Sequence, residues 1–316
     1  MRLRETSAAP EPALARLLEQ FEEHFTYPLG GEQRFRISHG EDYLRFYRAI
    51  GEARCFVAEA SGSIAGVLCA AVRGLQLPDG REVVAGYLGD LKVDTAQRYT
   101  RTLLTLAQAA RAWLDGRIQA AYSVVMDGTS AVPSRYTGRL GVPLFKELGR
   151  IAVLRLPAAP VTGELADSWD AGPERGEATY RGLAGRGYAS LGGFPEERSE
   201  MRSMWLVHAN GEACGRLEDT RRAKRLYAGD GSEILSAHLS CFAFSDVAAA
   251  LQLLGEARRR ASKEGFPALF VAVPDSVATV LCAALGKLEC LVAPATVYGT
   301  GVDRPAAPWY IHSAEI

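Results

Sequence analysis

Residues 87–104 of the chain read YLGDLKVDTAQRYTRTLL. The pattern predicts an apolar strand, a short polar turn and the start of a long helix. The turn carries two arginines and two hydroxyl residues beside the helix start. Because the first backbone N–H groups of a helix are unpaired and point outward, a strand that leads into a helix N-terminus forms an anion site. The stretch therefore predicts a coenzyme phosphate site, although its turn contains no glycine.

The composition is that of a soluble globular protein. A length of 316 residues favours two domains, since one domain typically has about 150 residues. The net charge of -1 provides no overall field for nucleic acid or an anionic membrane. No apolar run approaches the roughly 18 residues that span a bilayer, and the charged N-terminus lacks the apolar core of a signal peptide. We therefore expect a cytoplasmic protein with no nucleic-acid or membrane partner.

The cysteines and histidines show no metal-binding pattern. The six cysteines stand at 55, 69, 214, 241, 282 and 290, without a Cys-x-x-Cys pair. Four of them lie inside apolar runs, which favours buried thiols in a reducing compartment. The five histidines lack the spacing of metal ligands. We expect neither disulfides nor a metal.

Two segments repeat one order of elements. Residues 85–141 read as strand, polar turn, long helix, six-residue strand, Asp-containing turn and short helix, and residues 234–286 repeat that order with few shared residues. The strands before and after each long helix should be parallel, because a crossover helix joins them. Hairpins at 55–72 and 203–218 should make the rest of each sheet antiparallel. The expected class is α+β, with mixed, mostly antiparallel sheets flanked by helices.

A linker separates the two repeats. The stretch from residue 157 to 176, PAAPVTGELADSWDAGPERG, is rich in Pro, Gly and acidic residues and has no periodicity. We predict an N-terminal domain over 1–157, a linker over 158–177 and a C-terminal domain over 178–316. The basic run at 221–225 reads as a solvated hairpin end, with an acidic substrate or nucleic acid as the alternative.

The order of elements resembles the GNAT superfamily of acyl-CoA N-acyltransferases. Residues 93–98, VDTAQR, are similar to the family's Val-Asp-Pro-x-x-Arg approach to the pyrophosphate loop. Arg98 falls in the Arg/Gln position of that loop, and Arg101 and Leu103 fall where the family has glycine. Ser130 matches the position of a family Asn by its distance from Gly141. In that family the fourth strand ends at a bulge beside the pantetheine arm. The resemblance implies two tandem GNAT-like domains.

The resemblance also implies a set of ligand-binding residues. Acetyl-CoA or another acyl-CoA would be the co-substrate, without a metal. The candidate cofactor-binding residues are Leu91, Lys92, Val93, Arg98, Tyr99, Thr100, Arg101, Thr102 and Ser130. Arg101 either pairs with phosphate or is a solvated arginine at the helix start.

Asp90 and Tyr136 are the candidate catalytic residues. The resemblance implies that Asp90, on the fourth strand, takes a proton from an attacking amine or anchors it. Tyr136 stands one residue before the family's Tyr position, held here by Thr137, and would assist the departing thiolate. The alternatives are an Asp bonded to nearby loop backbone and a Tyr that covers the helix–sheet seam. Backbone N–H groups near residues 91–93 would bind the oxyanion.

The second repeat matches the family less well at the chemistry. Cys282 stands in the Tyr position, and the loop at 244–249 has no Arg, Gln or Gly. We therefore expect only the N-terminal domain to bind acyl-CoA and to transfer the acyl group, acetyl in the first instance, to an amine of a small molecule or peptide. The alternative is a non-catalytic GNAT-like protein that binds a ligand or a partner. Whether the protein forms a homodimer is left open.

Overall fold

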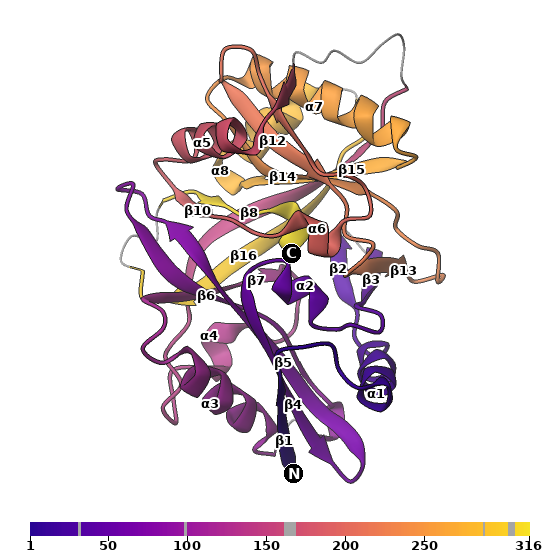
Figure 1. Ribbon diagram of the computed structural model, residues 1–316, viewed down its shortest axis with the longest axis vertical. Helices are drawn as coiled ribbons and strands as arrows, with labels where there is room; N and C mark the ends of the chain where they lie inside the picture. Colours follow the sequence, from indigo (N-terminus) through magenta and orange to yellow (C-terminus); the bar gives the residue numbers. More distant parts are fainter. Residues whose placement is uncertain (31–32, 98–99, 161–168, 287, 303–306) are drawn as a thin grey trace.

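The computed structural model describes residues 1–30, 33–97, 100–160, 169–286, 288–302 and 307–316 (Figure 1). The strands are β1 (Arg2–Thr6), β2 (Tyr27–Gly30), β3 (Gln33–Ser38), β4 (Glu52–Ala60), β5 (Ser63–Gln76), β6 (Glu82–Val93), β7 (Ala120–Met126), β8 (Lys146–Pro157), β9 (Asp170–Ala171), β10 (Tyr188–Ser190), β11 (Met204–Val207), β12 (Ala213–Glu218), β13 (Arg225–Ala228), β14 (Ala237–Phe244), β15 (Ala268–Pro274), β16 (Leu291–Thr300) and β17 (Trp309–Tyr310). The α-helices are α1 (Pro12–Glu22), α2 (Arg45–Arg48), α3 (Thr102–Leu114), α4 (Pro133–Tyr136), α5 (Pro173–Leu183), α6 (Pro195–Arg198), α7 (Val247–Lys263) and α8 (Asp275–Leu285).

Alternating side chains of β4 and β5 build two apolar layers in the first half. Cys55, Val57 and Val67 pack with α1 on one face, and Phe56 and Leu68 pack with α3 on the other. The period of two along each strand separates these sets. Strands of this sheet are thus buried on both faces, as their near-continuous apolar sequences indicate.

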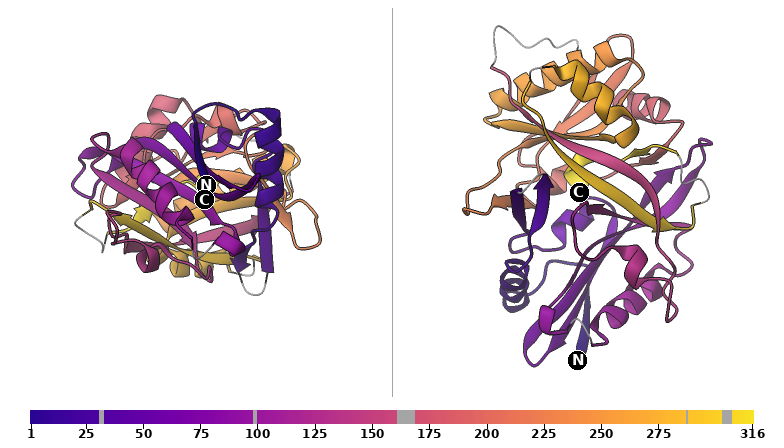
Figure 2. Two further views of the ribbon diagram at one scale, coloured as in Figure 1. Left: turned by 90° about the horizontal axis from the view of Figure 1, so that it is seen from below. Right: turned by 180° about the vertical axis from the view of Figure 1, so that it is seen from behind.

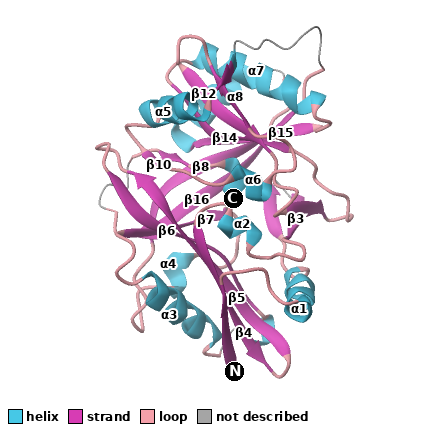
Figure 3. Ribbon diagram, in the orientation of Figure 1, coloured by secondary structure: helices cyan, strands magenta, loops and turns pink. Residues whose placement is uncertain are grey.

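The second half repeats this arrangement around β12 and β14. Helix α7 covers one face, where Leu217 and Leu239 lie, and helix α5 covers the other, where Cys214 and Cys241 lie. Figure 3 shows the helices placed around the continuous run of strands. The predicted α+β class with mixed, mostly antiparallel strands is confirmed.

The predicted parallel pairs are also present. Strand β6 pairs with β7 in parallel, and β14 pairs with β15 in parallel. The hairpins β4–β5 and β11–β12 are antiparallel, as expected. The strand predicted at the start of residues 85–141 is β6.

One large sheet runs through both halves, in the order β1-β4-β5-β6-β7-β16-β8-β15-β14-β12-β11-β9. Strand β16, from late in the chain, lies between β7 and β8, and β8 in turn pairs with β15. Figure 2 shows β8 and β16 running side by side from one half to the other. Each half therefore receives a strand from the other. The division at 157 and 178 stays a prediction.

Some local expectations differ from the structure. The short helix expected before Gly141 is limited to α4, since Thr137 is already extended. The predicted linker contains β9 and the start of α5, and its residues 161–168 lie outside the described part. The basic run at 221–225 is not wholly solvated, because Lys224 is 2% exposed. Among the described helices, none is long and apolar enough to cross a membrane.

Candidate functional site

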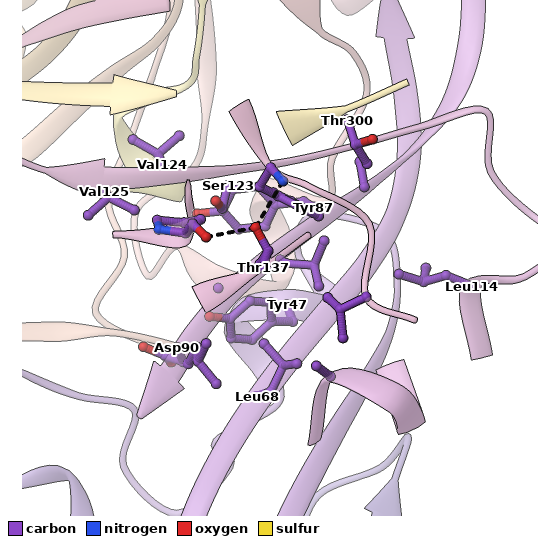
Figure 4. A pocket seen from close by; sticks show the side chains of 18 of the residues that line it. Tyr47, Leu68, Tyr87, Asp90, Leu114, Ser123, Val124, Val125, Thr137 and Thr300 are labelled. Carbon is purple, nitrogen blue, oxygen red and sulfur yellow. Dashed lines mark hydrogen bonds between the residues drawn. The ribbon is translucent and has the colours of Figure 1, made fainter. Parts of the chain in front are cut away.

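A cavity of about 540 Å³ opens where β6 and β7 separate. The two strands pair only over residues 85–87 and 120–122, although both continue further. Residues 88–91 and 123–126, which follow the last pair, line the cavity (Figure 4). Helix α3 contributes the apolar side chains of Leu103, Ala107 and Leu114 to the wall of the cavity. The gap therefore offers a largely apolar site that includes a few polar groups, among them Asp90.

The bulge implied by the resemblance is present in β6 and contains Asp90. Gly89 lies opposite Cys69 and Lys92 opposite Val67, so the pairing shifts by one residue between them. Asp90 has φ +52°, a left-handed conformation that is uncommon outside glycine and concentrates at functional sites. A Cβ on Gly89 would lie 2.5 Å from the Tyr47 hydroxyl, so glycine is required beside the bulge. The bulge turns the carboxylate of Asp90 to the cavity (Figure 4).

Asp90 belongs to a buried ionic cluster with Glu22, His39 and Lys92. The Lys92 Nζ lies 3.0 Å from Asp90 Oδ1 and donates to Glu22 Oε1 at 2.7 Å. His39 Nδ1 lies 2.6 Å from Glu22 Oε1, and its Nε2 lies 3.3 Å from Asp90 Oδ2. The carboxylates of Glu22 and Asp90 and the imidazole of His39 lie close enough to one another to hold a metal ion. Since the Lys92 ammonium already contacts both carboxylates, the cluster fits an ammonium counterion better than a metal ion.

The electrostatics of this cluster keep both of its carboxylates ionised. Burial alone would raise the pKa of Asp90, but Lys92 and His39 lower it to about 2. The pKa of Glu22 is lowered in the same way, against the effect of burial. Lys224 lines the same cavity, and burial lowers its pKa to about 7, so at neutral pH it is only partly charged. Asp90 therefore offers an arriving amine an anionic acceptor.

One oxygen of the Asp90 carboxylate lacks a hydrogen-bond donor. Asp90 Oδ2 is buried and has no donor in hydrogen-bond geometry among the described residues. If His39 donates from Nδ1 to Glu22, its Nε2 is also an acceptor, 3.3 Å from that oxygen. Two facing acceptors repel unless a proton lies between them, and a buried acceptor without a donor is costly. A ligand N–H group would satisfy both.

Tyr136 lines the opposite part of the cavity from α4. Burial raises its pKa, so the hydroxyl keeps its proton at neutral pH and is a donor. Thr137, which holds the family's Tyr position, donates its hydroxyl to the Pro133 carbonyl at 2.7 Å and accepts the Phe145 N–H at 2.9 Å (Figure 4). Of these two adjacent residues, Thr137 is engaged with the backbone, so Tyr136 is the better candidate for the hydroxyl that assists the thiolate.

The predicted cofactor-binding residues divide into distinct environments. Leu91 lines the cavity, whereas Val93 ends β6 and pairs with Gly66. The side chain of Lys92 is held in the buried cluster, so only its backbone is available to a coenzyme. Arg98 and Tyr99 lie outside the described residues.

The remaining candidates surround the start of α3 and the turn after β7. Arg101 is the exposed N-cap residue of α3, with Thr100 exposed beside it. The Thr102 side chain is buried and bonds Thr100 at 2.8 Å. Ser130 is exposed beside the cavity-lining residue Ala131. Arg101 and Thr100 are therefore the described groups of this turn that face solvent.

Sequence reasoning missed Glu22, His39 and Tyr47. One signal was available for Glu22, because it continues the i, i+4 series of Leu14 and Leu18 on the buried face of α1. A charge on such a face requires a buried partner. His39 directly follows the short strand β3, and Tyr47 lies in the short helix α2. No periodicity in such short elements indicates that these residues lie beside β6.

No family model and no curated protein matches the chain by sequence. By structure, the chain is similar to N-myristoyltransferase of Saccharomyces cerevisiae with bound myristoyl-CoA, at 11% identity and a TM-score of 0.61 over 96% of this chain and 84% of that one. It is also similar to a GCN5-related N-acetyltransferase of Anabaena variabilis, at 15% identity and a TM-score of 0.54 over 96% and 73% of the two chains. A probable N-acyltransferase of Enterococcus faecalis aligns with a TM-score of 0.50 at 8% identity, over 95% and 72% of the two chains. The chain therefore has the GNAT fold that its sequence pattern predicted.

Proposed function

We propose that this protein is an N-acyltransferase that moves an acyl group from coenzyme A to an amine. The observation that carries the proposal is the cavity between the separated ends of β6 and β7, with the acceptor atoms of Asp90 and His39 at its polar end. The structurally similar proteins are named as acyltransferases, which supports the same class of reaction here.

In this proposal the acyl thioester lies in the gap and its phosphates lie near the start of α3. The apolar walls from Leu91, Leu103 and Ala107 suit a pantetheine arm and an acyl chain. The helix N-terminus and the exposed Arg101 supply positive potential for phosphate. Because the turn has no glycine, we expect Arg101 to contact phosphate by its side chain rather than by close backbone approach.

The amine would bind beside Asp90 Oδ2 and His39 Nε2, with an N–H group directed to each. Its nitrogen attacks the thioester carbonyl, the C–S bond breaks, and the surplus proton passes to His39, whose charge Glu22 and Asp90 balance. Asp90 acts mainly as the anchor, because a carboxyl with a pKa of about 2 is a weak base. Tyr136 donates its proton or a hydrogen bond to the departing thiolate. The oxyanion would be bound by backbone N–H groups after the bulge.

A Tyr136→Phe variant tests the thiolate step. We expect the release of free CoA from acetyl-CoA or longer acyl-CoA in the presence of an amine to fall about 10²-fold or more, the usual range for loss of one acid–base group. Binding of acyl-CoA by calorimetry should be unchanged, because the ring stays in the wall. Tyr227→Phe is the matched control, since Tyr227 contacts Arg36 and is absent from the cavity lining. Equal CoA release in both variants would contradict the assigned role.

The alternative is a GNAT-fold protein that binds acyl-CoA without turnover. One observation favours it. Asp90 is already paired with Lys92, so its carboxylate is less available to bind a substrate amine. The same assay separates the two, because the alternative predicts calorimetric binding of acyl-CoA with no release of CoA for any amine. An acyl-CoA series from acetyl to myristoyl would show which chain the cavity accepts.

A further inference from the structure

The second half contains a bulge that repeats the one at Asp90. Strand β14 shifts its pairing with β12 between Cys214 and Arg216, and Cys241 there has φ +53°. Both bulges lie on the strand that pairs in parallel for three residues with its neighbour, β6 with β7 and β14 with β15. Cys241 is therefore the counterpart of Asp90. A non-glycine residue in this conformation at both positions points to a second functional site.

A histidine and a glutamate complete an array behind Cys241. The Cys241 Sγ lies 3.2 Å from His312 Nε2, and His312 Nδ1 lies 3.1 Å from Glu315 Oε1. This is the order of a nucleophile, a base and a group that orients the base. Burial opposes the charged imidazole, yet the Cys241 sulfur and the Glu315 carboxylate raise the pKa of His312 to about 9. The raised pKa makes His312 a stronger base toward the adjacent Cys241 thiol.

The chain positions this array with its own C-terminal segment. Where β14 and β15 separate, the segment from β17 to the short 3₁₀ helix Ser313–Glu315 fills the gap, and Ser313 donates to the Phe270 carbonyl at 3.3 Å. Arg198 Nη1 donates to Glu315 Oε1 at 3.1 Å, and Arg73 pairs with the other oxygen. Glu315 is thus held in place for His312. This segment thus occupies the place that corresponds to the β6–β7 gap in the first half.

The surrounding charges favour an anion at Cys241. Three buried guanidinium groups, of Arg73, Arg198 and Arg216, face two buried carboxylates, of Glu218 and Glu315. One positive charge is in excess within this network. A positive environment stabilises a thiolate and increases its reactivity, whereas apolar burial makes a thiol inert.

A cavity of about 610 Å³ gives access to the sulfur. Cys241, His312 and Arg216 line it together with Tyr180 of α5. The Nε of Arg216 is buried and has no hydrogen-bond partner among the described residues, so a guanidinium donor remains for a ligand. Gly193 also lines this cavity, and a Cβ on it would lie 3.3 Å from Glu315 Oε1, a close contact that glycine avoids.

We propose that Cys241 is a nucleophile, activated by His312 and Glu315, that accepts an acyl group from a small acyl thioester bearing a carboxylate. Arg216 binds that carboxylate. The Cys241 proton passes to His312 Nε2 as the sulfur bonds the acyl carbon. The thioester C–S bond then breaks, and the departing thiolate takes the proton from His312. Cys241 is left as an acyl thioester and His312 is neutral again. This inference does not rest on the function proposed for the β6–β7 cavity.

Alkylation of the full-length protein tests the nucleophile. With limiting iodoacetate and peptide mapping by mass spectrometry, Cys241 is expected to react before the other five cysteines. Buried Cys69, whose pKa is raised by burial, is the internal reference. His312→Gln should slow the alkylation of Cys241 at least about tenfold, because thiolate formation is lost. Equal rates at Cys241 and Cys69, or no effect of His312→Gln in a variant that folds by circular dichroism, would overturn the proposal.

A second comparison tests the anionic substrate. Arg216→Met should abolish the preference of Cys241 for iodoacetate over neutral iodoacetamide while retaining the iodoacetamide reaction. The succinyl thioester of N-acetylcysteamine should acylate Cys241 faster than the acetyl thioester, and Cys241→Ser should remove the label. An unchanged preference in Arg216→Met would contradict the role of Arg216. If Cys241 reacted rapidly with iodoacetate but was not acylated by the succinyl thioester, the proposed acyl transfer would be wrong.

Discussion

In the Asp90→Asn variant, the kcat/KM for the amine is expected to fall by about 10²- to 10⁴-fold, the range for loss of an acid–base group and its anchor. The amide keeps the shape of the carboxyl but removes its negative charge, so the site no longer favours an ammonium group. The buried Asp90 Oδ2 is the acceptor that we assign to the amine. His39→Gln is expected to act in the same way, since it removes the proton acceptor 3.3 Å away.

The measurement is amide formation from acyl-CoA with the amine varied, together with the affinity for acyl-CoA by calorimetry. The affinity should be retained, because the acyl chain contacts the apolar wall. Asp94→Asn is the matched control, since Asp94 lies just after β6 and caps the Ala96 N–H at 2.7 Å outside the ionic cluster. The Asp90→Asn substitution removes one of the two negative charges that Lys92 contacts, although Lys92 stays paired with Glu22. Thermal unfolding checks that the variant remains folded. If Asp90→Asn and Asp94→Asn turned over equally, the assignment of the amine site would be wrong.

Replacement of Arg198 by methionine is expected to lower the free energy of unfolding by about 3–5 kcal/mol, as found when one partner of a buried ion pair is removed. Arg198 is fully buried and joins two carboxylates. Its Nε donates to Glu218 Oε2 at 2.8 Å and its Nη1 to Glu315 Oε1 at 3.1 Å. Both carboxylates would lose a buried partner, although Arg216 and Arg73 still contact them.

Urea denaturation compares this variant with Arg54→Met. Arg54 pairs with Glu5 at 3.1 Å, with both side chains about one third or more exposed. An exposed pair contributes only about 0–1 kcal/mol, because solvent screens it and holding the two side chains costs entropy. The large difference between the two variants is the expected result. Similar losses would show that the network around Arg198 is not a stabilising feature of the fold.

The sequence was sufficient for the class of fold because the strongly periodic segments are also the ones that form the sheet. The strand and long helix that residues 87–104 predict, and the two parallel crossovers, followed from pattern alone. The exchange of β8 and β16 between the halves did not, because strand order depends on tertiary pairing that no local pattern records. Strands β2 and β3 are short and lie in a stretch without periodicity, so no local pattern indicates them.

The candidate site was predicted in part. The bulge, Asp90 and Tyr136 followed from the resemblance, and the structure brings both residues to one cavity. The partners of Asp90 did not follow, since Glu22 and His39 come from distant segments. Cys241 was interpreted as an inert buried thiol, and its histidine lies 71 residues away in the sequence, beyond any local motif. Residues that fold topology alone brings together cannot be found by spacing.

Amide hydrogen exchange with and without a non-hydrolysable acyl-CoA analogue tests the central claim most directly, because it shows where the acyl donor binds. We predict protection of residues 88–91 and 123–126, which line the gap between β6 and β7, and of the start of α3. Residues 240–244 and 272–274, at the ends of β14 and β15, should be unchanged, since the chain fills that gap with its own segment. Absence of protection at 88–91 and 123–126 with saturating analogue, or protection confined to β14 and β15, would contradict the account.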